Sequence, residues 1–181
     1  MKKIILIVFS LVLFLFGCDS MMNTPTKRVE EFLNSYQRHD KEVMSQLDSS
    51  IRNGNYDFNE EQILSYKELM KKQYKDLTYV IKEEEIDGNN ATVTVEIEVY
   101  DLNKSINDSE EYYLKNSNEF TSEDGVIDNT KFLNYKIKQM TDTKERIKYT
   151  LNLTLSKTDK KWVLNDITES DRQKIHGLYS T

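Results

Sequence analysis

Apolar residues near the start of the chain recur at the spacing of an α-helix over residues 25–38. They fall at i, i+3, i+4 and i+7 and so share one helical face. This face consists of Val29, Phe32, Leu33 and Tyr36. Thr24 followed by Pro25 is typical of a helix start, with a threonine cap and proline in the first turn.

Two more helices are expected after this one. Asp40 is a candidate cap for a second helix, which the Asn53-Gly54-Asn55 cluster would end. Asn59 and Gln62 have the spacing of a capping box and predict a third helix that continues to about Tyr74. The apolar faces of these two helices are Val43, Met44, Leu47 and Ile51, then Ile63, Tyr66, Met70 and Tyr74.

The apolar period then changes to two, which indicates β-strands. Residues 77–81 and 91–100 alternate on either side of the turn at 87–90, and residues 147–156 alternate before a turn at 158–160 and a last strand at 161–167. The sequence therefore predicts two antiparallel hairpins, each with one buried face and one solvated face.

About forty residues, 102–143, separate the hairpins, which is too long for a structureless loop in a compact domain. We expect two helices there, over 109–116 and 128–143, with a break at Asp124-Gly125. A short tail around 171–178 follows the last strand. The order of elements predicts an α+β fold in which N-terminal helices pack on a four-stranded antiparallel sheet, with a helical insert between the hairpins.

The first residues have the layout of an export signal. Lys2 and Lys3 precede an apolar run over 4–16, which is too short to cross a bilayer. The run closes with Leu15-Phe16-Gly17-Cys18, which resembles the bacterial lipobox. That resemblance implies cleavage between Gly17 and Cys18 and acylation of Cys18, and hence a signal peptide over 1–17, a lipidated tether over 18–26 and a domain over 27–181. The alternative is that Cys18 is an ordinary apolar residue of an uncleaved signal anchor.

Composition narrows the choice of partners. The formal net charge is −6, and removal of the signal peptide would make it more negative, which disfavours nucleic acid as a partner. With one cysteine in the chain, no internal disulfide can form. Two acyl chains on Cys18 would make the membrane its stable attachment point.

Two stretches carry a resemblance to a fold family. The segments TPTKRVEEFLNSYQRHDKEVMSQL, residues 24–47, and KKWVLNDI, residues 160–167, are similar to NTF2-like lipoproteins of Gram-positive bacteria, including domains of unknown function. The resemblance implies a curved sheet wrapped around the first helix as a cone, whose mouth can hold a small apolar ligand. The helical insert would then cap or fill that mouth.

Motifs for catalysis or cofactor binding are sparse. His39 and His176 have no second histidine or cysteine at ligand spacing, so we expect solvated side chains and no metal. No serine motif supplies an activated nucleophile, and the five scattered glycines form no phosphate loop, so no cofactor is expected. The acidic run 82–85 is expected to be a solvated hairpin end rather than a cation site.

Enzymes of the NTF2-like family pair a cavity carboxylate with a tyrosine or acid donor. Tyr149 and Asp166 are the residues of those types expected near a cavity here, on the presumed buried face and on the closing strand. A set of tyrosines could also contribute to a cleft, namely Tyr66, Tyr74, Tyr79, Tyr112, Tyr113 and Tyr135. The hypothesis favoured by these patterns is a membrane-anchored, extracytoplasmic and non-enzymatic binding module, whose partner is a small molecule, an envelope component or a protein. The alternative is a cavity isomerase or hydrolase.

Overall fold

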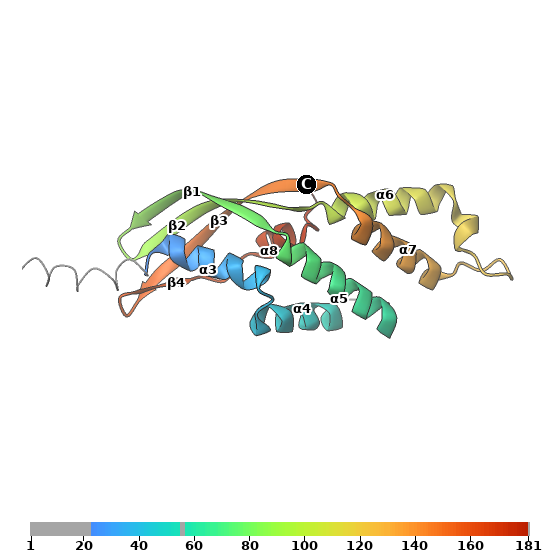
Figure 1. Ribbon diagram of the computed structural model, residues 1–181, viewed down its shortest axis with the longest axis horizontal. Coiled ribbons are helices and arrows are strands. Elements are labelled where there is room, and N and C mark those ends of the chain that lie inside the picture. The colour runs from blue at the N-terminus through green and yellow to red at the C-terminus, as the bar shows by residue number, and fades with distance from the viewer. Residues whose placement is uncertain (1–22, 55–56, 181) are drawn as a thin grey trace, which may run out of the picture.

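The computed structural model describes residues 23–54 and 57–180, and within them it has the predicted α+β architecture. These residues form six α-helices, one 3-10 helix and a four-stranded antiparallel sheet (Figure 1). In chain order the elements are α3 (Pro25–Gln37), α4 (Lys41–Asn53), α5 (Glu60–Lys75), β1 (Thr78–Asp87), β2 (Asn90–Tyr100), α6 (Leu102–Lys115), η1 (Ser117–Phe120), α7 (Asn129–Asp142), β3 (Arg146–Thr158), β4 (Lys161–Leu164) and α8 (Glu169–His176).

Two of the three predicted caps at the N-terminal helices are present. Thr24 Oγ1 accepts from the backbone N–H of Lys27 at 3.1 Å, and Asn59 and Gln62 form the reciprocal capping box at the start of α5. Asp40 lies at the predicted N-cap position of α4, but its side chain makes no capping hydrogen bond. Its carboxylate instead forms an ion pair with Arg38 at 2.7 Å, so it is not available to the first turn of the helix.

The sheet has the strand order β1-β2-β3-β4, and both predicted hairpins are confirmed. In the central pair, Ile97 lies opposite Tyr149 and Val95 opposite Leu151, so the buried positions of β2 and β3 face the same side. β1 departs from the predicted alternation because a bulge between Ile81 and Glu83 shifts its register. Every residue of β1 beyond that bulge is exposed, including the acidic run, as expected for a solvated hairpin end.

The insert between the hairpins forms a helical pair, α6 and α7, joined by η1 and an isolated bridge between Thr121 and Ile127. The helix α6 begins at Leu102, seven residues before the predicted start. Its inner face is made of Leu102, Ser105 and Ser109, and two serines give no apolar periodicity from which to predict it. Asp101 caps this first turn by accepting from the N–H of Lys104 at 2.9 Å.

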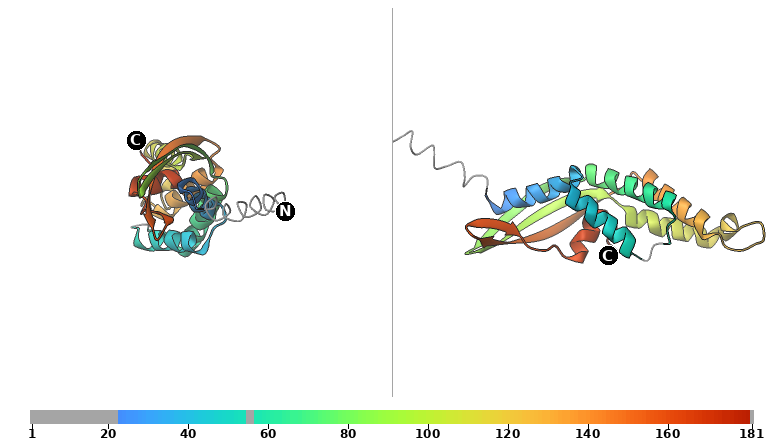
Figure 2. Two further views of the ribbon diagram at one scale, coloured as in Figure 1. Left: turned by 90° about the vertical axis from the view of Figure 1, so that its left-hand side faces the viewer. Right: turned by 90° about the horizontal axis from the view of Figure 1, so that it is seen from below.

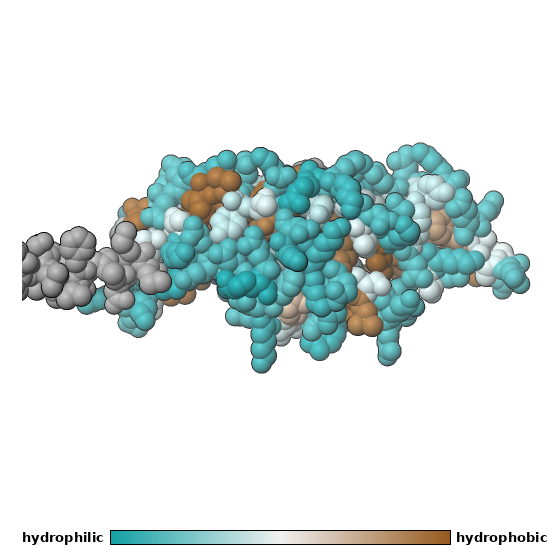
Figure 3. Space-filling view, in the orientation of Figure 1, coloured by the Kyte–Doolittle hydropathy of each residue, from teal (hydrophilic) through white to brown (hydrophobic). Residues whose placement is uncertain are grey.

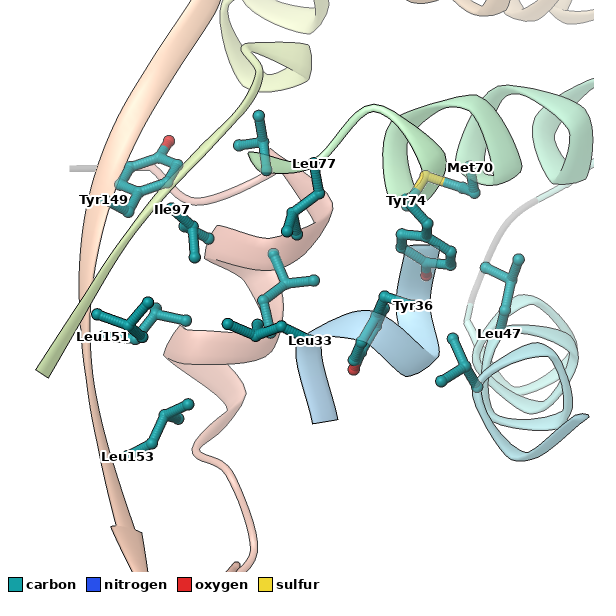
Figure 4. Packing of buried hydrophobic residues seen from close by; sticks show 14 of the residues in the cluster. Leu33, Tyr36, Leu47, Met70, Tyr74, Leu77, Ile97, Tyr149, Leu151 and Leu153 are labelled. Atoms are coloured by element: carbon teal, nitrogen blue, oxygen red, sulfur yellow. The ribbon is translucent and has the colours of Figure 1, made fainter. Parts of the chain in front are cut away.

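The main core lies between the sheet and the N-terminal helices. Leu33 and Tyr36 of α3 lie between Ile97 and Leu151 of the sheet on one side and Leu47 of α4 on the other (Figure 4). The molecule is elongated, and the α6–α7 pair projects from the sheet at the end opposite to the start of α3 (Figures 1 and 2).

Most of one face is hydrophilic, with hydrophobic residues gathered over β1 and near α5 and α7 (Figure 3). Val80 and Ile86 of β1 and Leu64 of α5 are exposed. No helix in residues 23–54 or 57–180 has the length and apolar character needed to cross a membrane.

Candidate functional site

The residues singled out in the sequence lie in different parts of the molecule. Gly17 and Cys18 lie outside the described residues. Tyr149 is buried on β3, where its hydroxyl donates to the carbonyl of Tyr179 at 3.3 Å and its ring meets that of Tyr179 edge-on. Burial raises the pKa of Tyr149 above its ordinary value.

Asp166 does not join Tyr149. The strand β4 ends at Leu164, so Asp166 lies beyond it rather than on the closing strand, and its side chain is exposed. The backbone N–H of the preceding residue, Asn165, donates to the carbonyl of Thr154 on β3. Thr154 is five residues along the strand from Tyr149, a separation of roughly 16 Å at the rise of a β-strand. The two residues are therefore too far apart to act on one bound molecule as an acid–base pair.

The strongest candidate for a binding site is a cavity of about 330 Å³ among the helices. It is surrounded by α4, α5, α6, α7 and α8, by the link before α5 and by the C-terminal tail. The apolar part of its lining is Phe58, Tyr66, Ile106, Leu133, Met140 and Leu178, and the polar part is Ser50, Lys136, Glu169, Gln173 and His176.

A buried glutamine holds these elements together. Gln73 of α5 is fully buried, and its amide nitrogen donates to the carbonyls of Tyr100 at 3.1 Å and His176 at 2.9 Å. Its oxygen accepts from the N–H of Tyr100 at 3.1 Å. One side chain thus joins α5 to the end of β2 and to the end of α8, which fixes the position of α8 at the cavity.

His176 belongs to the polar part of the cavity lining, and Tyr74 is its hydrogen-bond partner. Tyr74 Oη lies 3.0 Å from His176 Nε2, and the ring of Tyr36 packs edge-on against Tyr74 at 5.1 Å. Burial, with a smaller contribution from the positive charge of Arg172, lowers the pKa of His176 to about 4. Burial also raises the pKa of Tyr74 far above its ordinary value.

These shifts determine what the pair can do chemically. At neutral pH both groups are uncharged, and each shift makes its group a weaker acid or base than it would be in water. The pair is therefore a neutral hydrogen-bonded unit, of which His176 reaches the cavity lining. Its pKa values are displaced away from those of an acid–base catalyst at neutral pH.

Charged groups at the cavity are balanced by partners. Lys136 forms an ion pair with Glu110 at 3.0 Å, and its ammonium lies 4.8 Å from the centre of the Phe132 ring. Glu169 pairs with Arg172 at 3.4 Å. An uncharged ligand would therefore leave no new charge unpaired.

Sequence reasoning missed His176 as part of a site. The expectation of a solvated side chain is wrong, because the C-terminal tail forms α8 and docks His176 against α5. His39 lies in the link between α3 and α4 and is partly exposed, and its Nε2 donates to the carbonyl of Lys71 at 2.8 Å. The indication in the sequence was the predicted inner face of α5. That face includes Tyr66, which lines the cavity, and Tyr74, the partner of His176.

No cluster of histidine, cysteine, aspartate and glutamate that could hold a metal ion occurs in the part of the chain that the structure describes.

Comparison with known proteins gives no family for the chain: no family model and no curated protein matches it. Among solved structures, the predicted lipoprotein YcdA from Bacillus subtilis subsp. subtilis strain 168 matches with a TM-score of 0.43 and 14% identity. The match covers 91% of this chain and 51% of YcdA, so the chain spans about half the length of that protein. A likeness at this level defines neither a shared fold nor a shared function.

Proposed function

We propose that the protein is a lipid-anchored, extracytoplasmic binding protein whose helical cavity holds a small, mostly apolar molecule. The sequence of residues 1–18 supports the anchor, because a short apolar run ends at the only cysteine. The cavity between α4, α5, α6, α7 and α8 is the observation that carries the binding function.

An NTF2-like architecture is part of this proposal, and the packing of α3 on the sheet supports it. Val29 and Leu33 of α3 are fully buried, and the inward residues Val95, Ile97 and Leu151 of the sheet are equally inaccessible. In this molecule the space between sheet and first helix is therefore filled with side chains. The binding cavity lies further along, where the helical insert and α8 meet α4 and α5.

The lining defines the kind of ligand. A volume of about 330 Å³ is at the lower end of the range of roughly 300–1,000 Å³ that is usual for small-molecule sites. Aromatic and aliphatic side chains form most of the wall, and the neutral His176, which is bonded to Tyr74, is one of the polar groups at one side. We therefore propose an uncharged ligand with an apolar body and one hydrogen-bonding group.

Binding can be tested with the fluorescent apolar probe N-phenyl-1-naphthylamine and the full chain in detergent. Leu133→Trp adds volume inside the cavity and is expected to weaken probe binding at least about tenfold. The matched control is Leu114→Trp, because Leu114 is 77% exposed at the far end of α6. The control should bind the probe as the unaltered protein does, after correction for partition into detergent. Equal binding by both variants, or none by the unaltered protein, would refute the proposed site.

A further inference from the structure

A groove with a mainly polar lining lies on another side of the α6–α7 pair, apart from the helical cavity. It measures about 510 Å³ and is formed by α6, α7 and the link at 143–145 that leads into β3. None of its lining residues belongs to the helical cavity described above. Its size is within the usual range of about 300–1,000 Å³ for small-molecule sites.

An aromatic pair forms one wall of this groove. The rings of Tyr112 and Tyr135 stack with centroids 5.1 Å apart and planes inclined by 24°. The buried Phe120 contacts both rings edge-on, with its centroid 6.3 Å from that of Tyr112 and 5.4 Å from that of Tyr135. Tyr112 nevertheless keeps 36% of its surface exposed. The stack is thus both held in place and accessible. Because the two tyrosine side chains are already ordered, they would lose little conformational entropy when a ligand packs on them.

Polar groups with unused hydrogen-bonding capacity lie beside the stack. Within the described residues, the side chains of Gln139 and Lys144 make no hydrogen bond or ion pair. Lys104, by contrast, forms ion pairs with Asp108 at 2.6 Å and with Glu145 at 3.4 Å. The groove therefore combines free donors and acceptors with a nearly balanced charge.

We propose that this groove binds a neutral saccharide. One face of a sugar ring carries C–H groups with partial positive charge, which are attracted by the negative face of an aromatic ring such as that of Tyr112 or Tyr135. The hydroxyl groups around its edge need both donors and acceptors, which the amide of Gln139 and the carboxylates provide. A charged ligand would disturb the ion pairs of Lys104. This site is independent of the proposed apolar ligand.

The test is titration calorimetry of the full chain, in a detergent without a sugar headgroup, with maltotriose and with tri-N-acetylchitotriose. Gln139→Ala removes a polar group that has no internal partner and should weaken binding of the saccharide about three- to tenfold. Tyr135→Ala should weaken it at least tenfold, whereas Tyr135→Phe keeps the stack and should stay within about twofold. The melting temperature of each variant shows whether the α6–α7 pair remains folded.

Gln173→Ala is the matched control, because Gln173 lines the helical cavity and not the groove. It should leave saccharide binding unchanged, and Gln139→Ala should leave binding of N-phenyl-1-naphthylamine unchanged, so the two proposals fail separately. Binding of either saccharide that Gln139→Ala and Tyr135→Ala weaken would support the site. No heat of binding at millimolar concentrations of both saccharides, or binding that these variants do not alter, would overturn it.

Discussion

His176 shows how one residue can link the stability of this protein to pH. Its imidazole lies against Tyr74, with Arg172 and Tyr36 close by, and burial lowers the pKa of His176 to about 4 from an ordinary value near 6.5. The unfolded chain therefore binds a proton on this residue at a higher pH than the folded chain does. Between those two pKa values, a fall in pH favours the unfolded state.

We expect the free energy of unfolding to decrease as the pH falls from about 6.5 to about 4, by up to about 3 kcal/mol from this residue. Above pH 7 the contribution should be constant. Ion-paired carboxylates such as Asp142 change stability in the same direction, because Lys138 lowers the pKa of Asp142. Urea unfolding of the unaltered protein and of His176→Asn at several pH values separates the two effects. Parallel pH profiles would contradict the assignment.

Gly177, the next residue, is required by its surroundings. It has a φ of +70°, and a Cβ placed there would lie 2.2 Å from the carbonyl oxygen of Tyr100 and 2.3 Å from Nε2 of Gln73. Gly177→Ala should reduce the free energy of unfolding by about 2–4 kcal/mol, through backbone strain and a clash with the buried Gln73 junction. Chemical denaturation measures this change.

The matched control for this prediction is Gly125→Ala. Gly125 has a φ of +80°, but a Cβ added there would meet nothing within 4 Å, so only the backbone strain remains, about 1 kcal/mol. If the two variants lost equal stability, the close approach at Gly177 would not be the cause.

Among the elements, β4 is short but contributes the single tryptophan to the core. Trp162 is 6% exposed, its backbone N–H donates to Asn23 Oδ1 at 3.1 Å, and α3 packs against its strand. Trp162→Ala should cost about 3–5 kcal/mol of stability, the range for removal of a large buried aromatic side chain.

The neighbouring Val163 provides the comparison, because it points to the other face of β4 and is 51% exposed. Val163→Ala should change the free energy of unfolding by less than about 0.5 kcal/mol. A melting midpoint for Trp162→Ala equal to that of Val163→Ala would show that Trp162 does not hold β4 against α3.

Elements with regular periodicity could be predicted from the sequence, and those set by distant contacts could not. The face of α3 and the alternation of β2 and β3 are properties of neighbouring residues, and both agree with the structure. The early start of α6 depends on two serines, Ser105 and Ser109, packed inside. The bulge in β1 inserts one residue without any glycine or proline to indicate it.

The candidate cavity was still less predictable. Tyr66 belongs to the predicted inner face of α5, but Phe58, Ile106 and Leu178 come from separate segments that meet only in the folded chain. His176 reaches the cavity because Gln73 ties the end of α8 to α5, a contact across 103 residues of sequence. Local patterns contain no information about such a contact.

At the scale of the whole molecule, the elements are arranged along one long axis. The start of α3 lies at one end and the α6–α7 pair at the other (Figure 1). If the chain is held to a membrane through Cys18, the described part of the chain begins nearest that anchor at the sheet end, where α3 starts. The groove on α6 and α7, for which we propose a saccharide ligand, then lies at the end away from that attachment point.

The anchor itself is tested by Cys18→Ala in the full chain, expressed in a bacterium with the lipoprotein processing pathway. The thiol of Cys18 is the only one in the sequence, so its removal should abolish incorporation of labelled palmitate and leave a precursor that keeps residues 1–17. Gly17→Ala keeps a small residue before the cysteine and should be labelled and processed as the unaltered chain is.

Membrane fractionation adds a second measurement, because two acyl chains hold a protein stably on a bilayer and the apolar run 4–16 is short for a span. Normal labelling and maturation of Cys18→Ala would exclude the lipobox, and an unlabelled, uncleaved but membrane-bound unaltered chain would favour the signal anchor.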